Sequence, residues 1–183
     1  MTFVTTPGFT MSTTMTASAA DLIVPTARMS LGYLMSLTKD VPADRWADCA
    51  VEGMNHPAFL FGHLAIYPNR VLAGFIERPD LVIECPFDEE AVVQGAECLP
   101  DASLYATMEV VVPFLLERYE TTIDAVSGVA PERWSAENPA GGRFTEMLPT
   151  VGAAVNFMLG HHVMMHSGQI SHWRRAIGLG SAN

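Results

Sequence analysis

Four long stretches of the chain repeat apolar residues at the spacing of an α-helix, and strand-like alternation of apolar and polar residues is nearly absent. The predicted helices span residues 19–37, 56–77, 103–126 and 151–177. An amphipathic helix must bury its apolar face against a neighbour, and four such helices do so by packing together. The pattern therefore predicts an all-α fold, a four-helix bundle with long connecting loops.

Proline, glycine and short polar residues mark where these helices begin, bend and end. Asn55 is predicted as the N-cap of the second helix, because Pro57 after it suits a first helical turn. Pro68 and Pro113 lie inside the second and third helices, where a missing N–H favours a kink. Gly178 is a suitable C-cap for the fourth helix.

The remaining segments divide the chain into an arm, a domain and two long connections. Residues 1–17 are rich in threonine and are expected to form a flexible N-terminal arm. Residues 18–183 are long enough for a single bundle domain with a sizeable core. The connections 78–102 and 127–150 are expected to shape the mouth of a pocket.

Charge and cysteine content limit the partners and the compartment. The formal net charge is −10, which repels phosphate backbones and anionic lipid head groups, so neither nucleic acid nor a membrane is an expected partner. No apolar run is long enough for a membrane span. The three cysteines form no C-x-x-C pair and favour a reducing, cytoplasmic location.

Four of the six histidines lie in the sixteen residues from Gly160 to Arg175. At about 100° per residue, His162, His166 and Gln169 fall on the same side of the helix as its apolar residues. His161 and His172 fall away from the centre of that side. Only His162 and His166 are therefore predicted to point into the bundle.

The second helix also directs a histidine inward. His63 lies on the apolar side of that helix, and His56, Tyr67 and Arg70 share its arc. Histidines at i and i+4, joined by one from a facing helix, can bind a divalent metal and leave positions open for water or substrate. The alternative is a purely structural bundle in which each imidazole is satisfied by a hydrogen bond.

These residues resemble the DinB/YfiT-like superfamily of four-helix-bundle proteins. "FLFGHLA" on the second helix and "HHVMMHSGQI" on the fourth are similar to the family pattern, a helix-two histidine followed by H-x-x-x-H-x-G-Q. "GAECLPDASLY" resembles the family's usual loop, and the likeness covers residues 19–178. The resemblance implies a divalent metal held by His63, His162 and His166.

The resemblance also implies what such a protein does. Zinc or nickel is the expected metal, with iron or manganese as further candidates, and members are commonly dimeric. Members with an assigned reaction include low-molecular-weight-thiol S-transferases and a mycothiol-dependent isomerase. The leading hypothesis is thus a metal-dependent transferase that acts on a small-molecule substrate with a cellular thiol.

Two further functions stay open: a metal-dependent hydrolase, and a non-catalytic stress-response protein that binds a metal or small ligand. Gln169 is a candidate to orient a metal ligand. Arg70 is a candidate to hold a substrate anion, or simply to form an ion pair on the helix surface. His56 and Tyr67 are candidates either to support a metal ligand or to face the substrate, because both share the arc of His63.

Overall fold

The computed structural model describes residues 18–182, and the predicted arm at residues 1–17 lies outside the described residues. Within this range the chain forms helices and no strand, apart from one isolated bridge between Glu137 and Thr150. The bounds of the α-helices are α1 Ala19–Ser36, α2 Pro57–Ala65, α3 Tyr67–Arg70, α4 Met108–Val126, α5 Pro131–Ser135, α6 Gly142–Met147, α7 Val151–Asn156 and α8 His162–Ala176. Two π-helical turns, η2 Val71–Phe75 and η5 Phe157–His161, continue α3 and join α7 to α8.

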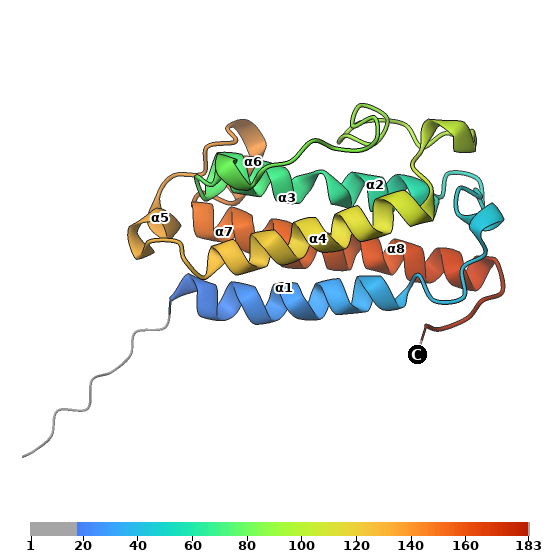
Figure 1. The fold of residues 1–183 in the computed structure, drawn as a ribbon, viewed down its shortest axis with the longest axis horizontal. Coiled ribbons are helices and arrows are strands. Elements are labelled where there is room, and N and C mark those ends of the chain that lie inside the picture. The colour runs from blue at the N-terminus through green and yellow to red at the C-terminus, as the bar shows by residue number, and fades with distance from the viewer. Residues whose placement is uncertain (1–17, 183) are drawn as a thin grey trace, which may run out of the picture.

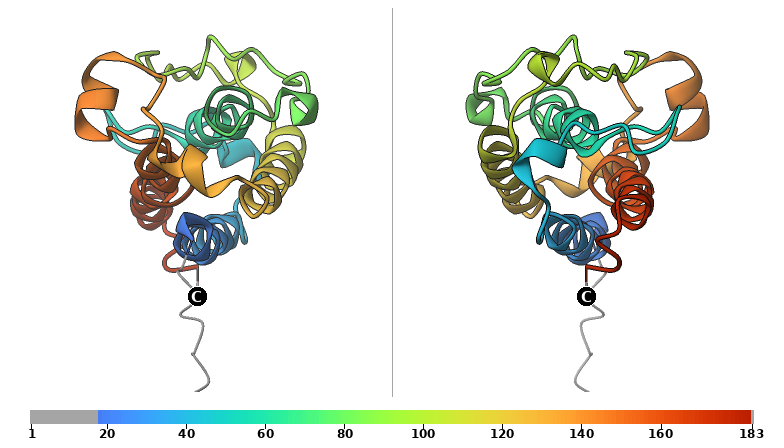
Figure 2. Two further views of the ribbon diagram at one scale, coloured as in Figure 1. Left: turned by 90° about the vertical axis from the view of Figure 1, so that its left-hand side faces the viewer. Right: turned by 90° about the vertical axis from the view of Figure 1, so that its right-hand side faces the viewer.

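These elements form four rods that lie side by side, as the prediction of a four-helix bundle required (Figure 1). The first rod is α1 and the third is α4. The second rod consists of α2, α3 and η2, and the fourth consists of α7, η5 and α8. Seen end-on they surround a common core (Figure 2), which is filled by large side chains such as Leu34, Phe61, Leu115 and Trp173. No helix within residues 18–182 has both the length and the apolar character needed to cross a membrane.

The first helix follows the prediction to within one residue, because its start is strongly specified. Ser18 and Asp21 form a reciprocal capping box that satisfies free N–H groups of the first turn. Farther along, α1 comes close to the π-turn η5: a Cβ on Gly160 would lie 3.0 Å from Cγ2 of Thr26. Glycine at this position therefore lets the first and fourth rods pack tightly near the histidines.

The second rod begins and bends differently in detail from the prediction. The N-cap is His56, not Asn55: the His56 Nδ1 atom accepts the backbone N–H of Phe59 at 3.2 Å. The rod is interrupted after Ala65, close to the predicted kink. Pro68 explains the interruption, because it has no N–H to donate to the carbonyl of Leu64.

The third rod starts later than predicted, at Met108 instead of Ser103. Residues Ala102–Leu104 form a single 3-10 turn, and Tyr105 then adopts an extended conformation. The Tyr105 hydroxyl accepts the backbone N–H of Leu99 at 2.8 Å, which ties this stretch to the preceding loop. Despite Pro113, α4 continues without interruption to Val126.

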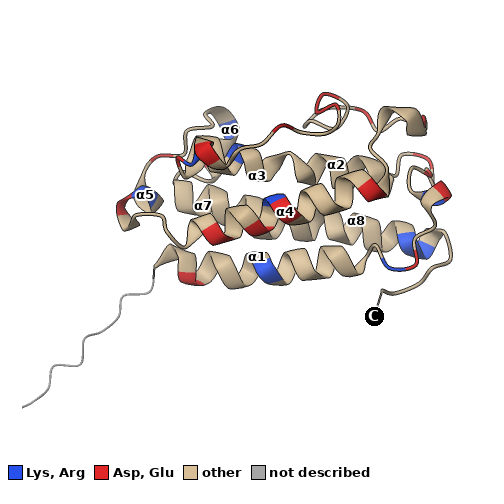
Figure 3. Ribbon diagram, viewed as in Figure 1, with Lys and Arg blue, Asp and Glu red and all other residues tan. Residues whose placement is uncertain are grey.

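The long 78–102 loop lies over the second rod (Figure 1) and is anchored to α4. The guanidinium of Arg118, which is nearly buried, donates to the carbonyl of Leu81 at 2.7 Å. Acidic side chains are spread along this loop and along α4 (Figure 3). The negative charge of the chain is thus placed largely on the outside of the bundle.

Candidate metal centre

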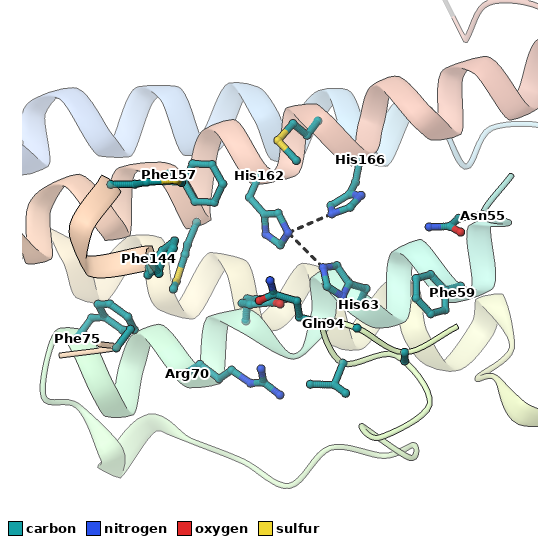
Figure 4. A pocket seen from close by; sticks show the side chains of 18 residues that line it. Asn55, Phe59, His63, Arg70, Phe75, Gln94, Phe144, Phe157, His162 and His166 are labelled. Carbon is teal, nitrogen blue, oxygen red and sulfur yellow. Dashed lines mark hydrogen bonds between the residues drawn. The ribbon is translucent and has the colours of Figure 1, made fainter. Parts of the chain in front are cut away.

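Three imidazoles from two facing rods meet at one point of the bundle (Figure 4). His63 comes from α2, and His162 and His166 come from successive turns of α8. The Nε2 atom of His162 lies 3.2 Å from that of His63 and 3.0 Å from that of His166. The sequence-based pairing of one helix-two histidine with the i, i+4 pair is thus matched by the geometry, and these three residues form a group that can hold a metal ion.

Two of the three rings are oriented by an acceptor on their far side. The His63 Nδ1–H donates to the carbonyl of Val92 at 2.7 Å, and the His166 Nδ1–H donates to Oε1 of Gln169 at 2.6 Å. With the proton assigned to Nδ1 in both rings, each Nε2 carries a lone pair. Both lone pairs point toward Nε2 of His162.

This arrangement fits a cation at the centre better than it fits three hydrogen-bonded imidazoles. His162 can place a single proton on Nε2, which satisfies only one of the two lone pairs that face it. An ion about 2.1 Å from three imidazole nitrogens holds them about 3.0 Å apart at right angles and about 3.4 Å apart at tetrahedral angles. The two Nε2 distances, 3.0 and 3.2 Å, fall within this span.

Burial keeps the imidazoles neutral, as ligands must be. The pKa of His63 is lowered to about 4, chiefly by desolvation, and the hydrogen bond to the Val92 carbonyl opposes this shift. The charged forms of His166 and Arg70 contribute to the lowering. Desolvation and the two neighbouring histidines lower the pKa of His162 to about 3. Burial also lowers the pKa of His166, although its bond to Gln169 acts in the opposite direction.

A cavity of about 690 Å³ opens onto the three histidines. Its wall is mostly apolar and aromatic, and among the described residues that line it Arg70 is the only charged side chain. Tyr67 packs edge-on against the rings of His63 and His162, and burial raises its pKa. The wall is completed by Asn55, Phe59, Phe75, Val93, Gln94, Gly95, Ala96, Ala140, Phe144, Met147, Phe157, Met158 and Met165.

The other predicted residues divide between the site and its surroundings. Arg70 lines the cavity with its guanidinium over the ring of Tyr67, at 5.3 Å, and 3.6 Å from the carboxylate of Glu89. Gln169 is exposed and reaches the site only through His166. His161 and His172 are exposed on α8, away from the bundle interior, as predicted.

The expectation that His56 faces the substrate is corrected by the structure. His56 is fully buried and does not line the cavity. Its Nδ1 accepts the N–H of Phe59 and its Nε2–H donates to the carbonyl of Leu99 at 3.0 Å. His56 shares the helical arc of His63 but lies about two turns before it, where the 78–102 loop covers His56 and separates it from the cavity.

Several site residues gave no signal in the sequence. The Val92 carbonyl that orients His63 is a backbone group, which any residue could supply. Phe144 and Met147 reach the cavity from α6, within a connection that was expected only to shape the mouth. The π-turn η5 inserts one extra residue per turn just before His162, which a wheel at a constant 100° per residue does not represent.

The comparison with family models agrees with the geometry. A model described as the DinB superfamily matches residues 27–170, which is more than half of the chain and contains all three histidines. The chain belongs to the DinB superfamily. The DinB match begins within α1 and ends within α8, so it includes all four rods of the bundle. Neither the search of curated proteins nor that of solved structures found a match to this DinB-superfamily chain.

Proposed function

We propose that this protein is a metal-dependent enzyme that transfers a low-molecular-weight thiol to a small, largely apolar substrate. The observation that carries the proposal is the convergence of three neutral imidazoles on a cavity of about 690 Å³. Zinc or nickel suits His63, His162 and His166, with iron or manganese as further candidates. When bound, such an ion supplies positive charge that lowers the pKa of a thiol into the neutral range.

The residues of the cavity favour a thiol over water as the nucleophile. No carboxylate lines the cavity within the described residues, so a general base of the kind that hydrolases use for water is missing there. A thiol needs less help, because its pKa starts near 8.5. The transfer forms a bond between the thiol sulfur and an electrophilic carbon and breaks the bond from that carbon to its leaving group, which departs with the electron pair. The proton that the thiol loses passes to solvent, and the leaving group takes up one proton, so the step is balanced.

Tyr67 and Arg70 have distinct proposed roles in that transfer. Tyr67 keeps its proton because burial raises its pKa, so its hydroxyl is available to donate to the departing group. Arg70 is held by Glu89 over a distance of 3.6 Å, an ion pair loose enough for a substrate carboxylate to replace. The four phenylalanines and three methionines of the wall would bind the apolar remainder of the substrate.

The experiment uses untagged protein and the variant His162→Ala/His166→Ala, with His161→Ala/His172→Ala as the matched control. We expect about one metal per chain in the wild type and the control, and almost none in the site variant. Conjugation of cellular thiols to a bimane-type electrophile should follow the metal content. Metal unchanged in the site variant would refute the site. Metal binding without conjugation of any thiol would refute the transferase and favour a binding protein.

We further propose a homodimer in the cytoplasm. Leu22 and Met29 on α1 and Met164 on α8 are exposed apolar side chains on two adjacent rods. A second copy covering them would remove that surface from water. Light scattering after size-exclusion chromatography should show a dimer for the wild type and a monomer for Met29→Glu. A wild-type monomer at micromolar concentration contradicts the proposal.

A further inference from the structure

A second group of reactive side chains lies at the N-terminal end of α2, outside the metal centre. Cys49 comes from the connection between α1 and α2, His56 is the N-cap of α2, and Cys98 comes from the 78–102 loop. One sulfur or ring nitrogen from each of the three lies within 4.8 Å of the others. Both cysteines are half-buried and present as free thiols.

The loop that carries Cys98 is tied to α2 at two points. The carbonyl of Val92 accepts from His63 and the carbonyl of Leu99 accepts from His56. We call residues 92–99 the cover segment. Its residues 93–96 line the cavity, and a Cβ on Gly62 would lie 2.9 Å from Cγ1 of Val92, so the segment packs closely on the helix. Cys98 is therefore one residue from the anchor that holds one end of the cover segment.

Both ring nitrogens of His56 already take part in hydrogen bonds, which disfavours a metal ion between His56, Cys49 and Cys98. Its Nδ1 lone pair accepts the N–H of Phe59 and its Nε2–H donates to Leu99. An ion would have to displace one of these hydrogen bonds and leave a buried backbone group without its partner. A bond between the two sulfurs, in contrast, leaves both hydrogen bonds of the His56 ring in place.

We propose that Cys49 and Cys98 form a reversible disulfide by exchange with a low-molecular-weight disulfide, and that this bond tethers the cover segment to the connection between α1 and α2. The sulfur of Cys49 attacks one sulfur of the small disulfide and expels the first small thiolate. The sulfur of Cys98 then attacks that of Cys49 and expels the second. Two protein thiols are oxidised, one small disulfide is reduced to two thiols, and the two protons pass to those thiolates.

The surroundings of Cys98 predict that the disulfide between Cys49 and Cys98 forms slowly at neutral pH. Burial raises the pKa of Cys98 to about 11, so this thiol stays protonated at neutral pH. The closing step, in which Cys98 is the attacking group, should therefore accelerate about tenfold per pH unit between pH 7 and 9. Once formed, the bond would close a loop of about 50 residues and restrict the motion of the cover segment.

The test treats the full-length protein with graded ratios of bis(2-hydroxyethyl) disulfide and 2-mercaptoethanol, followed by thiol counting and intact-mass measurement. We expect the wild type and the control Cys85→Ser to lose two thiols and two hydrogen atoms, with no adduct retained. Cys49→Ser and Cys98→Ser should instead retain one mixed-disulfide adduct. Peptide mapping should identify the 49–98 link, and closure should quicken with pH as stated above.

A second readout examines the tether itself. Hydrogen exchange of the backbone amides at residues 92–99 should slow on oxidation of the wild type and stay unchanged in Cys49→Ser. Persistence of all three free thiols, or a disulfide that includes Cys85, overturns the proposal. So does Zn²⁺ that binds at one equivalent to His162→Ala/His166→Ala and protects both Cys49 and Cys98 from exchange. A 49–98 disulfide with unchanged hydrogen exchange overturns the tether.

Discussion

Replacing Gly62 with alanine adds one methyl group where α2 meets the cover segment. That Cβ would lie 2.9 Å from Cγ1 and 3.5 Å from Cβ of Val92. The distance to Cγ1 is shorter than two carbon atoms can approach without a shift of the chain. Alanine gains about 1 kcal/mol over glycine inside a helix, and overpacking a core costs about 1–3 kcal/mol. Since Val92 is buried, we expect a net loss of about 0–2 kcal/mol in the free energy of unfolding.

The same methyl group should weaken metal binding, because displacing Val92 lengthens the bond from its carbonyl to His63. Loss of such an orienting bond typically lowers metal affinity about 10- to 100-fold. Urea unfolding of the metal-free protein and calorimetric titration with Zn²⁺ measure the two effects. Val92→Ala removes the blocking methyl groups, so Gly62→Ala/Val92→Ala should bind Zn²⁺ more tightly than Gly62→Ala alone.

Gly32→Ala is the matched control, because a Cβ at this position on α1 meets nothing within 4 Å in the described part of the chain. It should raise the free energy of unfolding by up to about 1 kcal/mol and leave the affinity for Zn²⁺ unchanged. The reasoning is refuted if Gly62→Ala matches this control in both stability and Zn²⁺ affinity. The cover segment would then not be what orients His63.

Three further predictions concern the metal centre and its cavity. Gln169→Leu removes the acceptor that orients His166, so calorimetry should show Zn²⁺ affinity about 10- to 100-fold lower. In the metal-free protein, folded-state pKa values of about 4 for His63 and about 3 for His162 lie below the unfolded value near 6.5. The unfolded chain therefore binds more protons below about pH 6.5, and urea unfolding should show the free energy of unfolding falling from there toward about pH 3. Arg70→Gln should raise KM for an anionic substrate severalfold with little change in melting temperature, because its ion pair is long, at 3.6 Å, and its side chains are 40% and 42% exposed to water.

Two of these predictions have a matched control variant. Gln94→Leu alters the cavity wall and should keep the wild-type affinity for Zn²⁺. His161→Ala/His172→Ala removes two exposed histidines and should preserve the dependence of stability on pH. If that variant loses the dependence, or if Gln169→Leu binds Zn²⁺ as the wild type does, the assigned roles are wrong. An unchanged KM in Arg70→Gln would show that Arg70 does not bind the anionic group of the substrate.

The sequence, together with the family resemblance, was sufficient to predict the bundle and the three histidines that meet within it. Helical periodicity reports which side of each helix is apolar, and that side must face the core whatever the packing partner. His162 and His166 could be paired because an i, i+4 spacing fixes their relation within one helix. His63 required the further step of placing a second helix opposite, to which the family resemblance contributed.

Only the tertiary structure decided what surrounds those histidines. The contact of the Val92 carbonyl with His63, the hydrogen bond from His56 to the carbonyl of Leu99 and the nearness of Cys49 to Cys98 all depend on the path of the 78–102 loop. The sequence of this loop shows no periodic pattern, because backbone carbonyls and scattered apolar contacts such as that of Val92 hold the loop in place. Local periodicity thus determined which side of its helix each of the three histidines occupies, and long-range packing determined how the histidines are brought together, oriented and covered.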